Sequence, residues 1–167
     1  MQHSLKLIGL LFLLLCIFSC TKYPEYPNEP RVSYVSAEAY LSEDALGNLD
    51  KNVELRFMLY DGDGDIGHSQ EDLDDTSFVE ISKFYSIFFV KKDGDFVPLD
   101  SLIATNTDVS IPQLRENGSD KFIKAEVTVD IPHSSLSLPY DTLFLTFFVT
   151  DRANNQSNID TSAVLVF

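Results

Sequence analysis

The stretch VELRFMLYDGDGDIG, from Val53 to Gly67, decides the fold class. Its first half alternates apolar with more polar side chains, which is the pattern of a half-buried β-strand. The positions that share the apolar face are Val53, Leu55, Phe57 and Leu59. Its second half, beginning at Asp61, is a loop of alternating Asp and Gly. We therefore interpret the stretch as a strand that runs into a turn-forming loop.

Strand patterns recur on both sides of this stretch, and no segment shows a sustained period of 3.6 residues. The further strands are predicted over Val32–Leu41, Tyr85–Lys91, Phe96–Val97, Ile123–Ile131, Asp141–Thr150 and Ile159–Phe167. Asp93-Gly94 lies between two of them and is a strong hairpin signal. The segment Asp141–Thr150 is apolar on both faces, which is typical of a central strand.

About seven short strands separated by Gly, Pro, Asn and Asp turns predict an all-β fold, an immunoglobulin-like β-sandwich over residues 32–167. The Cys…Trp…Cys core of true immunoglobulin domains is absent, because the chain has no Trp. A domain of this size buries roughly two-thirds of its unfolded surface, so it needs no disulfide. We find no internal repeat and expect one domain.

Residues 1–19 are interpreted as a lipoprotein signal peptide. Lys6 precedes an uninterrupted apolar run from Leu7 to Phe18. This run is too short to span a membrane, which takes about 20 residues, but it suits the apolar region of a signal peptide. It ends in Ile17-Phe18-Ser19-Cys20, which resembles a bacterial lipobox, and the expected lipidation site is therefore Cys20. Ordinary signal cleavage near Cys20 is the alternative.

Residues 20–31 form a Pro-rich spacer in which Pro24, Pro27 and Pro30 follow the period of a polyproline II helix. At about 3.1 Å per residue, this spacer would hold the domain roughly 30 Å from the membrane. The formal charge is −14 for the whole chain, and loss of Lys6 with the signal peptide makes it −15. Such an acidic protein repels nucleic acid and anionic lipid head groups. We therefore expect membrane contact through the lipid anchor only.

The Asp/Gly loop is a candidate calcium site. Asp61, Asp63 and Asp65 recur at every second position, which in an extended strand would separate neighbours by about 6–7 Å. One calcium ion needs ligand oxygens at about 2.3–2.6 Å, so the chain must curl, and Gly62 and Gly64 permit this. From Asp61 to Asp75 there are seven carboxylates and no Lys or Arg. The spacing resembles the start of an EF-hand, but Ile66 occupies the sixth position, where an EF-hand needs Gly, so an EF-hand is not expected.

A second loop, Asp151 to Asn158, completes the predicted site. In an immunoglobulin-like sandwich, the loop after the second strand and the loop before the last strand lie at the same end. We therefore predict that one Ca²⁺ is bound by Asp61, Asp63, Asp65 and Asp151, with Asp74 and Asn154 as weaker candidates. His68 would suit a transition metal, but the oxygen-rich surroundings favour a hard cation. The alternative is a solvated acidic turn without a metal.

The lipobox, the spacer, the DGDGDIG loop and the late stretch TDRANNQSN (residues 150–158) together resemble small cell-envelope lipoproteins of Bacteroidota with immunoglobulin-like folds. The resemblance implies a cell-envelope location at the outer membrane and no enzymatic activity. It implies no particular ligand, and the side of the outer membrane stays open. Ser101 and Thr142 lie in patterns that resemble O-glycan acceptors of this group.

Few residues point to catalysis. After removal of the signal peptide, the only histidines are His68 and His133, and neither lies in a nucleophile motif. We therefore expect a protein that is not an enzyme, acting as a structural or protein-interaction module of the cell envelope. The alternative is a glycan-binding lipoprotein of a polysaccharide-uptake system, which would need an exposed aromatic platform.

Overall fold

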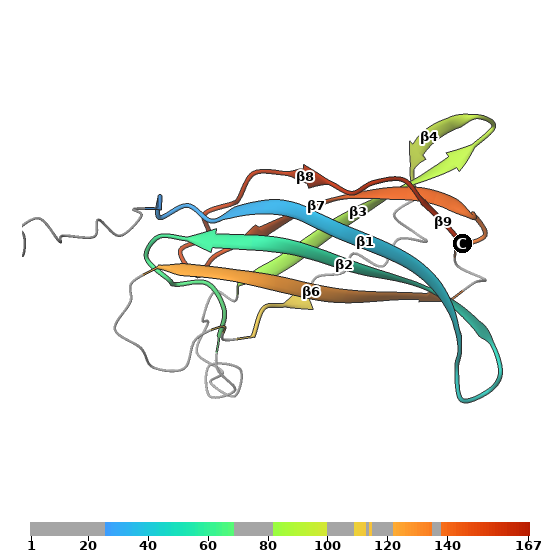
Figure 1. Cartoon of the computed structure of the whole chain (residues 1–167), viewed down its shortest axis with the longest axis horizontal. Coiled ribbons are helices and arrows are strands. Elements are labelled where there is room, and N and C mark those ends of the chain that lie inside the picture. Colours follow the sequence, from blue (N-terminus) through green and yellow to red (C-terminus); the bar gives the residue numbers. More distant parts are fainter. Residues whose placement is uncertain (1–25, 69–81, 100–108, 113, 115–121, 135–137) are drawn as a thin grey trace, which may run out of the picture.

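The computed structural model describes residues 26–68, 82–99, 109–112, 114, 122–134 and 138–167, which form two antiparallel sheets packed face to face (Figure 1). The first sheet has the order β1-β2-β6, with β1 at Arg31–Glu43, β2 at Leu49–Asp61 and β6 at Ile123–Ser134. The second has the order β4-β3-β7-β8, with β4 at Asp95–Pro98, β3 at Lys83–Lys92, β7 at Thr142–Thr150 and β8 at Asp160–Thr161. Two short strands complete it: β5 (Val109–Ser110) pairs with β3, and β9 (Leu165–Val166) pairs with β7.

The prediction of an all-β sandwich is confirmed. Strands β1, β2 and β6 take the places of strands A, B and E of an immunoglobulin-like domain, and β3, β7 and β8–β9 take those of C, F and G. The part of the chain that the structure describes contains no helix. Accordingly, none of these residues belongs to a helix long and apolar enough to cross a membrane.

Two short strands distinguish the structure from the predicted set of about seven. β5 was not predicted, because two residues carry no periodic signal. The predicted final strand Ile159–Phe167 is divided into β8 and β9. Between them the side-chain hydroxyl of Ser162 accepts a hydrogen bond of 3.0 Å from the backbone N–H of Leu145. A side chain thus replaces a backbone acceptor there, and the ladder is interrupted.

The core between the sheets is apolar and rich in phenylalanine. Phe57 of β2 is fully buried, and its ring centroid lies 5.7 Å from that of Phe84 on β3 and 5.2 Å from that of Phe147 on β7. These contacts join the two sheets, as the alternation of the strands requires. Burial of side chains of this size is the main contribution to the stability of the fold.

The β3–β4 hairpin lies at the opposite end of β3 from the loop that follows β2 (Figure 1). Its turn residues Asp93 and Gly94 have φ angles of 52° and 99°, and two positive φ angles match the right-handed twist of the flanking strands. The hairpin predicted from Asp-Gly is therefore confirmed.

The last residues of the predicted spacer 20–31 lie against the sandwich. The Tyr26 ring is 5.4 Å from that of Tyr60 and 5.5 Å from that of Phe122, and β1 already begins at Arg31. The extended spacer is correspondingly shorter than predicted. Cys20 and the rest of residues 1–25 lie outside the described residues.

Candidate metal centre

Asp61 is the last residue of β2, and it is fully buried. Its Oδ2 accepts a hydrogen bond of 3.2 Å from the backbone N–H of Ile66, whereas Oδ1 is buried and has no hydrogen-bond partner. Burial of a carboxylate oxygen without a partner is unfavourable, and such groups in folded proteins require a specific cause. Oδ1 of Asp61 is therefore a buried hydrogen-bond acceptor without a donor, at the start of the acidic loop.

Asp63 and Asp65 bring two further carboxylates to the same place. One oxygen from each of Asp61, Asp63 and Asp65 lies within 4.8 Å of the others. Ligand oxygens on opposite sides of one Ca²⁺ are separated by about 5 Å, so the three oxygens are close enough to share an ion. Oδ1 of Asp65 is also buried and unpartnered, while Asp63 is exposed.

The glycines shape this loop in two different ways. Gly64 has a φ of 71°, so the chain curls there in a conformation that other residues adopt at a cost. Gly62 has an ordinary φ, contrary to the expectation that it aids the curl, and its role is close packing. Its N–H donates a hydrogen bond of 2.9 Å to the carbonyl of Pro27, and a Cβ there would collide with the backbone oxygens of Tyr26 and Pro27.

The β7–β8 loop lies against the acidic loop that begins at Asp61, as the sandwich topology led us to expect. Nε of Arg152 donates a hydrogen bond of 3.1 Å to the backbone oxygen of Asp65, and the N–H of Ala153 bonds to the Asp65 carboxylate. β2 and β7 belong to different sheets, so these bonds connect the two layers at this end of the sandwich.

Asp151 lies near the cluster but is not one of its three gathered carboxylates. It is 1% exposed, and its two carboxylate oxygens accept bonds of 2.7 and 2.8 Å from the backbone and side-chain nitrogens of Asn155. Asp151 thus closes its own loop, and it acts on the cluster through its charge. Of the weaker candidates, Asn154 is exposed with a φ of 64°, and Asp74 lies outside the described residues.

The electrostatics of the cluster favour the binding of a cation. The pKa of Asp61 is raised to about 7, chiefly by burial and also by the neighbouring carboxylates of Asp63, Asp65 and Asp151, while the Ile66 hydrogen bond acts in the opposite direction. Burial, followed by the charge of Asp151, raises the pKa of Asp65 to about 6. A cation would offset both the desolvation of these groups and their mutual repulsion.

His68 lies apart from the gathered oxygens. Its backbone N–H donates to the carbonyl of Ile111 at 3.2 Å, and its buried Nδ1 has no hydrogen-bond partner. Among the described residues, the cluster that could hold a metal contains carboxylates only. This donor set favours a hard cation such as Ca²⁺.

At the end of the sandwich that carries the acidic loop, several contacts were not predicted from the sequence. Arg152 was not recognised as a bridge between the loops, although it is the only cation in the late polar stretch. Asn155 was not recognised as the partner of Asp151, because this stretch holds several side-chain amides that could each bond to a carboxylate. The contact of Tyr26 and Pro27 with Gly62 has no local sequence signal.

Comparison with known proteins identifies no relative of this chain. No protein-family model, curated protein or solved structure matches the chain significantly.

Proposed function

We propose that this chain is a calcium-stabilised β-sandwich, attached to the cell envelope through a lipid on Cys20, which serves as a structural or protein-interaction module. The observation that carries the proposal is the fully buried carboxylate of Asp61, whose Oδ1 has no partner and which lies beside Asp63 and Asp65. An ion would supply the missing partner.

The position of the acidic loop supports a stabilising role for the ion. The loop continues from β2 of one sheet and is bonded to Arg152 after β7 of the other. A ligand that binds only the folded state stabilises it by about 2.7 kcal/mol at a hundred times its dissociation constant. Calcium outside the cytoplasm is plentiful, so a site with a dissociation constant of roughly 10⁻⁴ M would suffice.

The envelope location rests on the sequence alone. The apolar run and the lipobox-like Ile17-Phe18-Ser19-Cys20 support lipidation, and the resemblance to Bacteroidota lipoproteins supports the outer membrane. No arrangement of nucleophile and base was recognised in the sequence, and we propose that the domain binds its partner without turning it over.

The alternative, a glycan-binding lipoprotein, requires aromatic rings whose faces are open to a sugar. The outer face of the β3–β7 pair does carry parallel rings: Phe89 with Phe144 (interplanar angle 3°) and Tyr85 with Phe148 (14°). Both pairs have centroids 4.8 Å apart and are stacked on each other. Each ring thus covers a face of its neighbour, and this geometry favours protein contact over a sugar platform.

Thermal unfolding with and without calcium tests the proposal. The melting temperature should rise with calcium, fall with a chelator and respond little to magnesium, which demands tighter octahedral geometry. Asp63→Asn should abolish the response, because Asp63 is an exposed member of the cluster whose loss leaves the core intact. Asp93→Asn, in the turn at the opposite end, is the matched control and should keep it. An equal calcium response in both variants would refute the site.

A further inference from the structure

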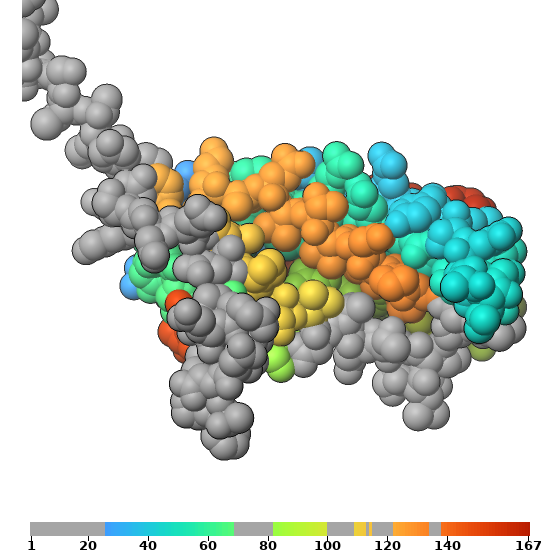
Figure 2. Space-filling view, turned by 90° about the horizontal axis from the view of Figure 1, so that it is seen from below, coloured from blue at the N-terminus to red at the C-terminus, as the bar shows by residue number. Residues whose placement is uncertain are grey.

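Residues 26–29, which come shortly before β1, lie against the end of the sandwich that carries the acidic loop, and we call them the strap. Figure 2 shows the blue start of the described chain and the green end of β2 at the same end of the molecule, opposite the cyan β1–β2 hairpin. Pro30, which is buried where β1 begins, is the fixed end of the strap. The strap therefore stands between the domain and the expected lipid anchor at Cys20.

The contacts of the strap surround Asp61, the buried carboxylate of the metal cluster. The Tyr26 ring lies 5.4 Å from that of Tyr60, the residue before Asp61. The N–H of Gly62, the residue after Asp61, donates a hydrogen bond of 2.9 Å to the carbonyl of Pro27. The strap thus contacts the chain on both sides of a proposed calcium ligand.

Few contacts hold the strap. Apart from the bond from Gly62, no hydrogen bond joins residues 26–29 to the rest of the described chain. The Tyr26 ring adds a contact with the ring of Phe122, at 5.5 Å between centroids. Between the strap and the β1–β2 pair there is a hollow of about 270 Å³, lined by Tyr26, Pro27, Glu29, Arg31, Ser33 and Tyr60. A segment held mainly by one bond and one ring can open locally while the core stays folded.

An ion on the acidic loop would fix the group to which the strap is bonded. Without an ion, the ionised carboxylates of Asp61, Asp63 and Asp65 repel one another, and Gly62 lies between two of them. With an ion, the loop is confined to the arrangement in which the Gly62 N–H meets the Pro27 carbonyl. A loop that one ligand has already ordered costs less entropy to bind a second. Because such coupling is reciprocal, a docked strap must raise the affinity for calcium by the same factor.

We propose that calcium fastens the strap to the acidic loop, an inference that rests on the proposed metal site and lipid anchor. When the strap is docked, residues 21–25 alone separate Cys20 from the domain. Release of residues 26–29 would lengthen this connection by roughly 12 Å, at about 3.1 Å per residue. Calcium would thus hold the domain nearer to the membrane and restrict its orientation. The alternative is a strap that the Tyr26 ring holds in place with or without an ion.

A single introduced tryptophan tests the docking, because the chain contains no Trp. Tyr26→Trp keeps an aromatic ring at the position that contacts Tyr60 and Phe122. The full-length chain would be studied in detergent with acrylamide, a neutral quencher of tryptophan fluorescence. Calcium should reduce the quenching at least about twofold, because it shifts the population towards the docked strap.

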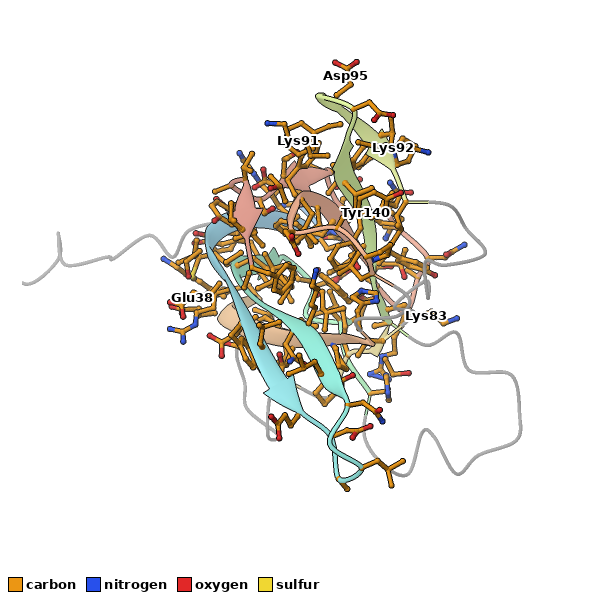
Figure 3. The ribbon with its side chains drawn as sticks, turned by 90° about the vertical axis from the view of Figure 1, so that its right-hand side faces the viewer. Glu38, Lys83, Lys91, Lys92, Asp95 and Tyr140 are labelled. Carbon is orange, nitrogen blue, oxygen red and sulfur yellow. The ribbon has the colours of Figure 1, made fainter. Side chains whose placement is uncertain are left out.

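Tyr140→Trp is the matched control for this measurement. Tyr140 is half-buried, as Tyr26 is, but it precedes β7 at the opposite end of that strand from Asp151. It lies at the end of the sandwich that faces the viewer in Figure 3. The quenching of Tyr140→Trp should not change with calcium.

Calorimetric titration measures the same coupling through the affinity for calcium. Tyr26→Ala should weaken calcium binding at least about fivefold, because the released strap no longer supports the loop. Tyr26→Phe should keep the wild-type affinity, since it keeps the ring that contacts Tyr60 and Phe122. Tyr140→Ala should bind calcium as the wild type does.

Three results would overturn the coupling. They are equal quenching of Tyr26→Trp with and without calcium, wild-type calcium affinity in Tyr26→Ala, and an equal loss of affinity in Tyr26→Ala and Tyr140→Ala. If the wild type binds calcium and one of these results is found, the coupling alone is contradicted. A wild type that binds no calcium contradicts the metal site, and the coupling with it.

Discussion

Nε of Arg152 donates a hydrogen bond of 3.1 Å to the backbone oxygen of Asp65, a residue 87 positions earlier in the chain. The bond connects the loop after β7 with the loop after β2, and these strands belong to different sheets. The acidic cluster therefore lies where the two layers of the sandwich meet. Whatever orders this cluster also strengthens the contact between the layers.

Gly62→Ala should destabilise the fold by about 1–3 kcal/mol, as for other substitutions that overpack a close contact. The reason is steric, because the new Cβ would collide with the backbone oxygens of Tyr26 and Pro27. Urea unfolding measures the loss. At Gly47, a Cβ meets no atom within 4 Å but φ is 81°, so Gly47→Ala measures backbone strain alone. Wild-type stability in Gly62→Ala would show that Tyr26 and Pro27 do not pack on the loop.

Phe57→Ala should cost about 3–5 kcal/mol, because Phe57 is fully buried between Phe84 and Phe147. Leu46→Ala is the control, since Leu46 is 87% exposed and its loss should change the free energy of unfolding by less than about 0.5 kcal/mol. Chemical denaturation of both variants measures the difference. Similar costs at the two positions would contradict the described core.

The stability of the calcium-free protein should increase as the pH falls from about 7 towards 4. Burial raises the pKa of Asp61 from 3.8 to about 7, so the folded chain holds this proton more tightly than the unfolded chain. The pKa of Asp65, raised to about 6, acts in the same direction. Calcium competes with these protons, and its stabilising effect should therefore grow as the pH rises.

Melting curves in chelator and in calcium across this pH range measure both trends. Asp61→Asn should remove most of the increase in stability that the calcium-free protein shows at low pH. Burial lowers the pKa of His133, so its contribution to stability is lost as the pH falls below about 6.5 and opposes the trend of Asp61. A chelated wild type that loses stability from pH 7 to pH 5 would contradict the raised pKa of Asp61.

Lipidation of Cys20 is a prediction from the sequence, and mass spectrometry of membrane-extracted protein checks it. The expected N-terminus is a diacylglyceryl-modified Cys20, which follows the apolar run and Ser19. Cys20→Ser should release the protein from the membrane, and Cys16→Ser should not. A soluble, unlipidated product with wild-type Cys20 would contradict the anchor.

The sequence predicted what depends on local periodicity and general topology. Alternation identified β2, and the sandwich topology placed the loop after β2 next to the loop after β7. The sequence did not predict which particular groups would pair. Examples are the contact of Pro27 with Gly62 and the bonding of both Asp151 oxygens to Asn155.

The outer face of β7 shows a further limit. The run from Asp141 to Thr150 is apolar on both faces, and the sequence correctly predicted a strand in the middle of a sheet. Periodicity could not show that Phe144 and Phe148 lie on the outer face of the sheet and stay half-buried, while alternate residues between them enter the core. A strand with a half-buried apolar outer face and a strand covered on both faces carry the same pattern.

Calorimetric titration of calcium into the chelator-treated wild-type protein tests the central claim most directly. The account predicts one ion per chain, held by the cluster of Asp61, Asp63 and Asp65, with a dissociation constant of roughly 10⁻⁴ M. Saturation should raise the melting temperature of the same sample. Absence of binding heat at millimolar calcium, with an unchanged melting temperature, would contradict the claim and leave the loop a solvated turn.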